Sequence, residues 1–250
     1  MSTNDHKNIT VMVTGAGLST RLRPLTDNIH KIMLPIAPGL PILEHLLKLM
    51  KFQGFENFVI NTHYLPHTIT DYFGDGKKMG INIAYSHEEE LLEVGGGVKK
   101  ASSLLSDPFI LVYGDHLHFF DFAPLLAMHK EKEGEGVITL SDAGDPQDGE
   151  VAELDKETGR IVRWHTRPHT ITSVSPQFLR NAGLYILSKK IIDYIPSNKK
   201  ISLDKEVLHR VVEETPLYGF RLSEPFVDIG TPERYQYAQT WYQDQLRKRA

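Results

Sequence analysis

The sequence predicts an α/β fold in which helices connect the strands of a parallel sheet. Short apolar runs at residues 9–13 and 58–61 alternate with segments of helical spacing such as residues 41–53. Parallel strands need crossover connections, which helices usually supply. Two further apolar runs end at Asp115 and Asp228. In folds of this class, ligands bind at the carboxyl edge of the sheet, where such aspartates would lie.

The other elements are predicted from apolar spacing and from the glycines and prolines at their ends. The expected strands are residues 81–86, 109–112, 136–140, 151–154 and 160–165, the last two paired as a hairpin. The expected helices are residues 66–73, 125–132, 191–195, 203–212 and 235–247. Residues 142–150 are polar and contain glycine, so we expect a mobile loop there.

Composition excludes several classes of protein. The chain has 250 residues, 40% hydrophobic and 24% charged, enough for one large domain or two small ones. The net charge of −4 argues against nucleic acid as a partner. Cysteine is absent, which excludes disulfides and cysteine metal sites. Residues 1–8 are polar and no apolar run reaches membrane-spanning length, so we expect a cytoplasmic protein with no membrane partner.

The segment after the first strand is predicted to bind phosphate groups. Residues 15–20 (GAGLST) are mostly small, and glycine lets backbone N–H groups approach a phosphate closely. Arg21 adds a planar charged fork and Lys31 a mobile ammonium, and both suit phosphate oxygens. Gly15 and Gly17 alone could equally make only a tight turn.

Two other patterns point to ligand contacts. The glycines at residues 95–97 stand before an expected helix and form either a flexible turn or a close approach to a flat ligand such as a nucleobase. Asp115 either caps the next helix or binds Mg²⁺ beside substrate phosphates, because carboxylates are ligands that this ion prefers. Asp228 is a matching second carboxylate and favours the metal site.

Residues 15–26, GAGLSTRLRPLT, with the His-Lys pair at 30–31, resemble the signature of sugar-1-phosphate nucleotidyltransferases. Residues 181–185 (NAGLY) and 228–232 (DIGTP) resemble two further elements of that family. The resemblance covers nearly the whole chain. It is strongest to the short bacterial enzymes that act on mannose, heptose or N-acetylmuramate phosphates.

The resemblance implies one Rossmann-like domain over residues 1–250, with a mixed, mostly parallel central sheet flanked by helices and no C-terminal left-handed β-helix. The implied reaction joins a nucleoside triphosphate to a sugar 1-phosphate and releases pyrophosphate, with Mg²⁺ as cofactor. GTP or UTP is the expected nucleotide.

The resemblance also assigns roles to individual residues. The nucleotide is bound by Ala16, Gly17, Leu18, Ser19, Thr20 and Arg21, with Gly95 and Gly96 at the base. Arg21 and Lys31 are the catalytic cations, and Asp115 and Asp228 hold the metal. Arg167, Asn181 and Gly183 bind the sugar phosphate.

Four residues depart from the family pattern: Ser19 replaces a glycine, His30 a proline, Val94 a threonine and Thr166 a glutamate. These departures leave two alternatives open. One is a cytidylyltransferase for a phosphorylated alcohol such as choline phosphate, and the other is a silent regulatory protein that binds nucleotide sugar. The sequence also leaves open which base and sugar are used and whether the chain forms homo-oligomers.

Overall fold

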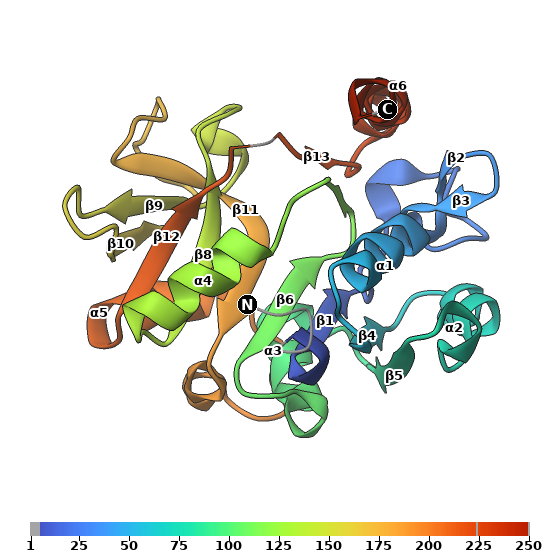
Figure 1. Ribbon diagram of the computed structural model, residues 1–250, viewed down its shortest axis with the longest axis horizontal. Coiled ribbons are helices and arrows are strands. Elements are labelled where there is room, and N and C mark those ends of the chain that lie inside the picture. The colour runs from blue at the N-terminus through green and yellow to red at the C-terminus, as the bar shows by residue number, and fades with distance from the viewer. Residues whose placement is uncertain (1–5, 224, 250) are drawn as a thin grey trace.

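The computed structural model describes residues 6–223 and 225–249. Within them, nine strands form one mixed sheet in the order β10-β9-β11-β6-β1-β4-β5, with β8 and β12 attached beside β11 (Figure 1). Its strands are β1 (Thr10–Thr14), β4 (Asn57–Thr62), β5 (Asn82–His87), β6 (Phe109–Tyr113), β8 (Gly136–Ser141), β9 (Val151–Leu154), β10 (Ile161–His165), β11 (Phe178–Leu187) and β12 (Leu217–Arg221). The expected mixed, mostly parallel sheet flanked by helices is confirmed.

The helices are α1 (Ile42–Phe52), α2 (His67–Phe73), α3 (Glu93–Ala101), α4 (Ala123–Lys132), α5 (Leu208–Glu214) and α6 (Pro232–Arg249). Four short strands complete the structure: β2 (Pro35–Ala37), β3 (Leu40–Pro41), β7 (His116–Leu117) and β13 (Val227–Asp228). None of the helices in the described residues is both long and apolar enough to cross a membrane.

Strand β1 lies in the middle of the sheet and is buried on both faces. Side chains on successive residues of a strand point to opposite faces. Accordingly, Val11 and Val13 pack with α1, α2 and α4, whereas Met12 packs with α3 and α5 on the other side. In Figure 1, α1 and α4 lie across the near face of the sheet. Burial on both faces explains why the strand is a continuous apolar run.

Parallel pairing brings the ends of two strands together. Strand β1 pairs in parallel with both β4 and β6, and Thr14 stands opposite Tyr113. The loop after β1 and the Gly114–Asp115 turn after β6 therefore emerge at the same edge of the sheet. Strand β6 pairs with β1 on one side and with the antiparallel strand β11 on the other. The pairing of β11 with β8 shifts register between Asn181 and Tyr185.

Helix α6 returns to the beginning of the chain. Its residues Ala238 and Trp241 pack with Leu22, Leu34 and other apolar residues of the segment after β1. The Tyr235 hydroxyl donates to the Pro35 carbonyl at 2.7 Å. Figure 1 shows α6 beside β2 and β3. This packing positions β13, which immediately precedes the helix.

The structure differs from the expected elements in several places, and β2, β3 and β11 are strands that were not among those expected. The glycines at 95–97 lie inside α3, which begins at Glu93, and not before a helix. Residues 203–212 form a π-helical turn (Leu203–Val207) followed by α5, and residues 189–194 form a 3₁₀ helix. Strand β12 was not expected; it pairs in parallel with β8. The remaining expected strands and helices are present.

Candidate active site

Two adjoining cavities lie at the carboxyl ends of β1 and β6. The first has a volume of about 320 Å³ and the second of about 270 Å³. Tyr113, Asp115, Glu150, Arg167 and Asp204 line both. The first cavity extends to the loop after β1 and the start of α3, and the second extends to β11 and β13. The shared residues therefore form the junction between two binding spaces.

The loop after β1 lies against the first cavity, which Ala16 and Gly17 line. Gly15 anchors the loop, because its N–H donates to Oδ1 of Asn61 at 2.7 Å. Asn61 in turn donates to the buried carboxylate of Glu88 at 2.7 Å. A Cβ on Gly15 would come within 2.8 Å of the Asn61 carbonyl oxygen, so only glycine fits there.

Leu18, Ser19 and Thr20 continue the loop outside the walls of the two cavities. Ser19 has a φ of 59°, in the left-handed region. That conformation costs a non-glycine residue about 1–2 kcal/mol, which explains why glycine is usual at this position. The Ser19 carbonyl is held by a 2.8 Å hydrogen bond from the Thr26 hydroxyl. Contact of these three residues with a nucleotide remains a prediction.

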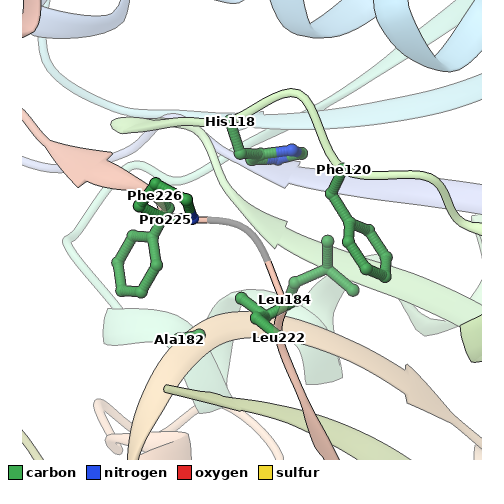
Figure 2. Close-up of a pocket in the computed structure, with 7 residues that line it drawn as sticks. All are labelled: His118, Phe120, Ala182, Leu184, Leu222, Pro225 and Phe226. Atoms are coloured by element: carbon green, nitrogen blue, oxygen red, sulfur yellow. The ribbon is translucent and has the colours of Figure 1, made fainter. Parts of the chain in front are cut away.

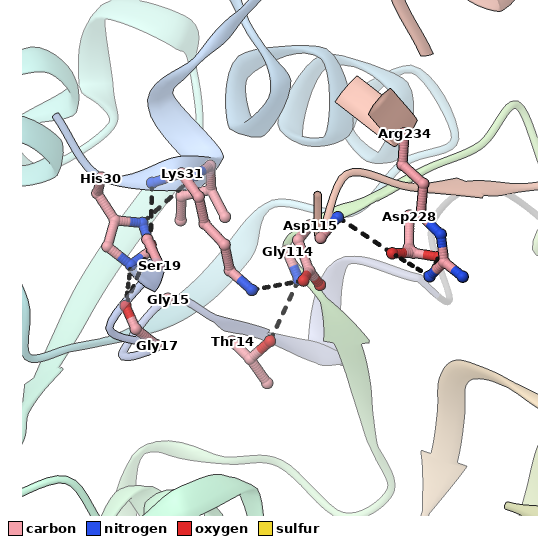
Figure 3. A network of polar contacts seen from close by, with 12 residues as sticks. Thr14, Gly15, Gly17, Ser19, His30, Lys31, Gly114, Asp115, Asp228 and Arg234 are labelled. Carbon is pink, nitrogen blue, oxygen red and sulfur yellow. Dashed lines mark hydrogen bonds and ion pairs between the residues drawn. The ribbon is translucent and has the colours of Figure 1, made fainter. Parts of the chain in front are cut away.

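His30 contacts the same loop through its imidazole ring (Figure 3). The side chain is fully buried, and burial together with the nearby Lys31 charge lowers its pKa from 6.5 to about 4. The imidazole is therefore neutral near pH 7. Its Nε2 lies 2.9 Å from the Gly17 carbonyl oxygen and donates to it, while Nδ1 accepts from the Ile32 N–H at 3.4 Å. His30 thus uses both ring nitrogens to hold the loop.

Lys31 and Asp115 meet at the junction of the cavities. Figure 3 shows the Lys31 ammonium pointing at the Asp115 carboxylate, and Nζ lies 2.5 Å from Oδ2. Burial raises the pKa of Asp115, but the charge of Lys31 and its hydrogen bond outweigh burial and hold that pKa well below its usual value. Asp115 is therefore ionised throughout the physiological range.

The pairing of β7 with β13 brings Asp228 to the same place. Asp228 stands opposite His116, and the Ile229 N–H donates to the Asp115 carbonyl at 3.1 Å. Arg234 donates to both oxygens of Asp228, at 3.1 and 2.8 Å, as Figure 3 shows. The two aspartates that are far apart in the sequence are thus neighbours in the fold.

The donor set at these aspartates suits a magnesium ion. Mg²⁺ is usually held by one or two carboxylates and completes its shell with water and substrate phosphates. Within residues 6–223 and 225–249, no cluster of three or more His, Asp or Glu side chains could hold a metal without such partners. Each carboxylate lines a cavity, but each also contacts a cation of the chain.

Arg167 lies at the junction, as the resemblance implied for a phosphate-binding cation. Its Nε lies 3.2 Å from Oε1 of Glu150, and Nη1 donates to the Asp148 carbonyl at 3.0 Å. Glu150 is buried, with an exposed fraction of only 5%. Thr166, which stands where the family has glutamate, lines a separate hollow beside Val162 and α5. The carboxylate beside Arg167 therefore comes from Glu150.

Asn181 and Gly183 form the bend of β11 that faces the second cavity. The Asn181 amide donates to the Tyr185 hydroxyl at 2.7 Å and accepts the Gly183 N–H at 3.1 Å. Gly183 has a φ of 72°, and a Cβ there would come within 2.6 Å of the His116 ring. The sugar-phosphate role of both residues remains a prediction, but their packing role is clear.

Asp204 is a buried carboxylate at the junction that the sequence did not reveal. Burial raises its pKa to about 6, although Tyr113 and Tyr185 donate hydrogen bonds that lower it. The Tyr185 hydroxyl lies 2.7 Å from Oδ1, and the Tyr113 hydroxyl contacts Oδ2. These hydrogen bonds connect Asn181, through Tyr185, to Asp204 and Tyr113, which line both cavities.

Gly95 and Gly96 lie against the backbone of residues 199–201. A Cβ on Gly95 would lie 2.8 Å from the Ile201 carbonyl oxygen, and one on Gly96 would lie 2.4 Å from that of Lys199. The neighbouring Leu91 and Val94 line the first cavity instead. The glycines thus permit close packing of α3, and their contact with a base remains a prediction.

Several residues of the site were missed in the sequence: Glu150, Arg180, Asp204 and Arg234. None belongs to a local motif. Glu150 ends the segment expected to be a mobile loop, which instead contains a 3₁₀ turn (Pro146–Asp148). Only its position between Gly149 and the apolar strand β9 is visible in the sequence, and that position carries no chemical signal.

Comparison with known proteins identifies the family of the chain. The family model described as nucleotidyl transferase matches residues 10–245. The chain is 35% identical over 228 residues to a mannose-1-phosphate guanylyltransferase of Mycobacterium tuberculosis. It is 32% identical over 244 residues to a UTP–glucose-1-phosphate uridylyltransferase of Synechocystis. Each match covers 90% of this chain and 61% of the relative.

A solved structure of UDP-glucose pyrophosphorylase complexed with UDP-glucose has the same fold. It matches with a TM-score of 0.80 at 19% identity, over 95% of this chain and 99% of that chain. At this identity the likeness concerns the fold alone. The chain spans about 61% of the length of the two curated relatives described above.

Proposed function

The chain belongs to the nucleotidyl transferase family, and on that premise we propose that it transfers a nucleotidyl group from a nucleoside triphosphate to a sugar 1-phosphate. The observation that carries the proposal is the contact of Lys31 with Asp115 at the junction of two cavities, with Asp228 held beside them. Two binding spaces that meet at a cation and a pair of carboxylates suit the joining of two phosphorylated substrates.

In this proposal the first cavity takes the nucleoside and its α-phosphate, and the β- and γ-phosphates extend toward the second cavity. Ala16 and Gly17 present backbone to the phosphates, and Leu91 and Val94 supply an apolar wall for the base. Arg21 lines the second cavity beside Asp228 and would hold the β- and γ-phosphates that leave as pyrophosphate. The acceptor phosphate then lies at the junction, within reach of Arg167.

The chemistry needs no nucleophile from the protein. A phosphate monoester carries a charge of about −1.5 to −2 at neutral pH, so an oxygen of the sugar phosphate attacks the α-phosphorus directly. The new P–O bond forms as the bond to the bridging oxygen of the β-phosphate breaks, and pyrophosphate leaves with that electron pair. Catalysis therefore consists of positioning and charge stabilisation.

Lys31 is placed to stabilise this transfer. An ammonium group has three N–H donors, and the Asp115 carboxylate uses only one of them. The other two can reach phosphate oxygens at the junction while the ion pair stays intact. Asp115 thus orients the ammonium, and His30 fixes the segment from which it extends.

Asp115 and Asp228 would hold Mg²⁺ together with phosphate oxygens of the nucleotide. A bound Mg²⁺ would withdraw negative charge from the α-phosphate as the transition state forms. Lys31 and Arg234 contact these carboxylates in the structure.

The acceptor would be a sugar 1-phosphate of the mannose, heptose or N-acetylmuramate type, with GTP or UTP as donor. The relatives carry names for GTP with mannose 1-phosphate and for UTP with glucose 1-phosphate. Asn181 and the buried Glu150 would hydrogen-bond sugar hydroxyls, Glu150 taking the role that Thr166 cannot fill.

The ion pairs also favour a second candidate, a protein that binds nucleotide sugar without turnover. Both candidate metal ligands, Asp115 and Asp228, are neutralised by Lys31 and Arg234. A protein that never binds metal would keep such pairs closed.

Pyrophosphate release in the presence of Mg²⁺ separates these candidates. GTP, UTP, CTP and dTTP are each combined with mannose, heptose, glucose and N-acetylmuramate 1-phosphates and with choline phosphate. Release with one nucleotide and one sugar phosphate supports the proposal, whereas release only with CTP and choline phosphate refutes it. Nucleotide-sugar binding without release would support the silent candidate.

A matched pair of variants tests the role of Lys31. Lys31→Gln should lower kcat/KM by about 100-fold or more, the usual effect of removing a charge that stabilises a transition state. Lys48→Gln, on the exposed face of α1, removes the same charge far from the cavities and should leave kcat/KM unchanged. Equal activity of the two variants would contradict the assignment.

A further inference from the structure

The second cavity contains an arginine to which the proposed reaction assigns no task. Arg180 lies on β11 next to Asn181 and lines this cavity. Its Nε is buried and has no hydrogen-bond partner in the described part of the chain. Burial lowers the pKa of the guanidinium, because the charged form loses water without gaining a partner. A ligand with a negative charge would supply that partner.

The other cations of the second cavity and of its junction with the first are accounted for, and Lys205 lines only the first cavity. Lys31 contacts Asp115, Arg167 contacts Glu150, and Arg234 contacts Asp228 and Asp148. Arg21 also has no ion pair among the described residues, but the proposed reaction places it on the leaving pyrophosphate. Arg180 is the cation that remains.

The carboxylates nearest to Arg180 do not satisfy it. The charges of Asp148, Asp228 and Asp145 raise the pKa of the guanidinium, and Arg234 lowers it. Both Asp148 and Asp228 accept hydrogen bonds from Arg234 instead. They hold Arg180 in a favourable potential and leave its donors for a ligand.

The guanidinium is held in a fixed position. Its Cζ lies 5.8 Å from the centre of the Phe226 ring, and a Cβ on Gly144 would come within 3.0 Å of it. Phe226 is itself stacked on His116 at 5.0 Å. Figure 2 shows Phe226 next to Pro225 at a small apolar pocket of about 10 Å³. The guanidinium is therefore bordered by the Phe226 ring and by the backbone at Gly144, and these contacts limit the positions that it can take.

From this arrangement we propose that Arg180 binds a second acidic group on the acceptor, so that the preferred substrate is a sugar 1-phosphate that also carries a carboxylate or a second phosphate. The inference rests on the proposed function. Arg167 lines both cavities and takes the phosphate that reacts, whereas Arg180 lines only the second. The acidic group lies on the part of the sugar that points away from the nucleotide. A guanidinium fork binds either anion with two parallel hydrogen bonds.

Pairs of acceptors that differ by one acidic group test the proposal. N-acetylmuramate 1-phosphate is compared with N-acetylglucosamine 1-phosphate, glucuronate 1-phosphate with glucose 1-phosphate, and glucose 1,6-bisphosphate with glucose 1-phosphate. For at least one pair, kcat/KM of the wild type should favour the acidic acceptor by about tenfold to a hundredfold, the usual value of a hydrogen-bonded charge. The pair that responds identifies the acidic group as a carboxylate or a phosphate.

Two variants show whether Arg180 is responsible. Arg180→Gln should abolish the preference for the acidic acceptor by raising its KM, and Arg180→Lys should retain part of it because the charge stays and the fork is lost. Arg210→Gln, an exposed arginine on α5, is the matched control and should keep the wild-type preference. Using the ratio of kcat/KM for each pair cancels any general loss of folded enzyme.

The competing result is that Arg180 binds the nucleotide. A higher KM for the nucleoside triphosphate in Arg180→Gln, with an unchanged ratio between acceptors, would overturn the proposal, as would a wild type that treats both members of every pair alike. If no acceptor is turned over, calorimetry on the same pairs decides. Tighter binding of the acidic member that Arg180→Gln removes would support the acidic subsite while the proposed reaction fails.

Discussion

Replacing His30 by glutamine should make the stability of the protein less dependent on pH. Glutamine is uncharged at every pH, and its Nε2 can donate to the Gly17 carbonyl much as the imidazole Nε2 does. At pH 7.5 we expect the free energies of unfolding of the two proteins to agree within about 1 kcal/mol, the value of one hydrogen bond.

The difference appears at lower pH. His30 has a pKa of about 4 in the folded protein and 6.5 as its ordinary value. The unfolded chain therefore binds the proton more readily, and the folded state loses stability as the pH falls from 6.5 toward 4. At pH 5 this loss amounts to about 2 kcal/mol for this pair of pKa values. His30→Gln lacks it.

Urea unfolding at pH 7.5 and pH 5.0 measures the effect. Between pH 7.5 and pH 5.0 the free energy of unfolding of the wild type should fall by about 2 kcal/mol more than that of His30→Gln. His45 and His118, whose pKa values burial also lowers, are present in both proteins and cancel in the comparison. An equal loss in both proteins would show that His30 does not hold its loop as a buried neutral imidazole.

Three other substitutions have defined outcomes. Ser19→Gly should raise the free energy of unfolding by about 0.5–1 kcal/mol in urea, because the relief of strain at φ 59° outweighs the chain entropy that glycine adds to the unfolded state; a less stable variant would contradict the left-handed geometry. Gly183→Ala should lower it by about 2–4 kcal/mol, through strain and contact with His116, and an unchanged midpoint would exclude that contact. Asp115→Asn should lower turnover by about 100-fold; full turnover would remove Asp115 from the metal site.

Sequence patterns predicted the features of the site that follow regular strands. The glycine-bearing loop after β1 and Asp115 after β6 meet at one edge of the sheet because these strands pair in parallel, whereas Asp228, which also ends an apolar run, arrives through the antiparallel pairing of β13 with β7. The strands and helices with clear apolar spacing were likewise found. These elements are determined by local chemistry.

The rest depends on contacts between distant segments. Glu150 and Arg180 reach the cavities because of the bend in β11 and the turn at Pro146–Asp148. No sequence pattern around either residue predicts that bend or that turn. The glycines at 95–97 were expected to stand before a helix. They lie inside α3 instead, and residues 199–201 pack so closely against Gly95 and Gly96 that a Cβ has no room. Tertiary packing overrode local preference there.

The central claim is tested most directly by product analysis with the active nucleotide and sugar phosphate. The account predicts that nucleotide-diphosphate sugar and pyrophosphate form in equal amounts, with Mg²⁺ present and with no nucleoside monophosphate. Formation of nucleoside monophosphate without nucleotide-diphosphate sugar would mean that water, and not the sugar phosphate, is the acceptor. That result would contradict the proposed transfer between the two cavities.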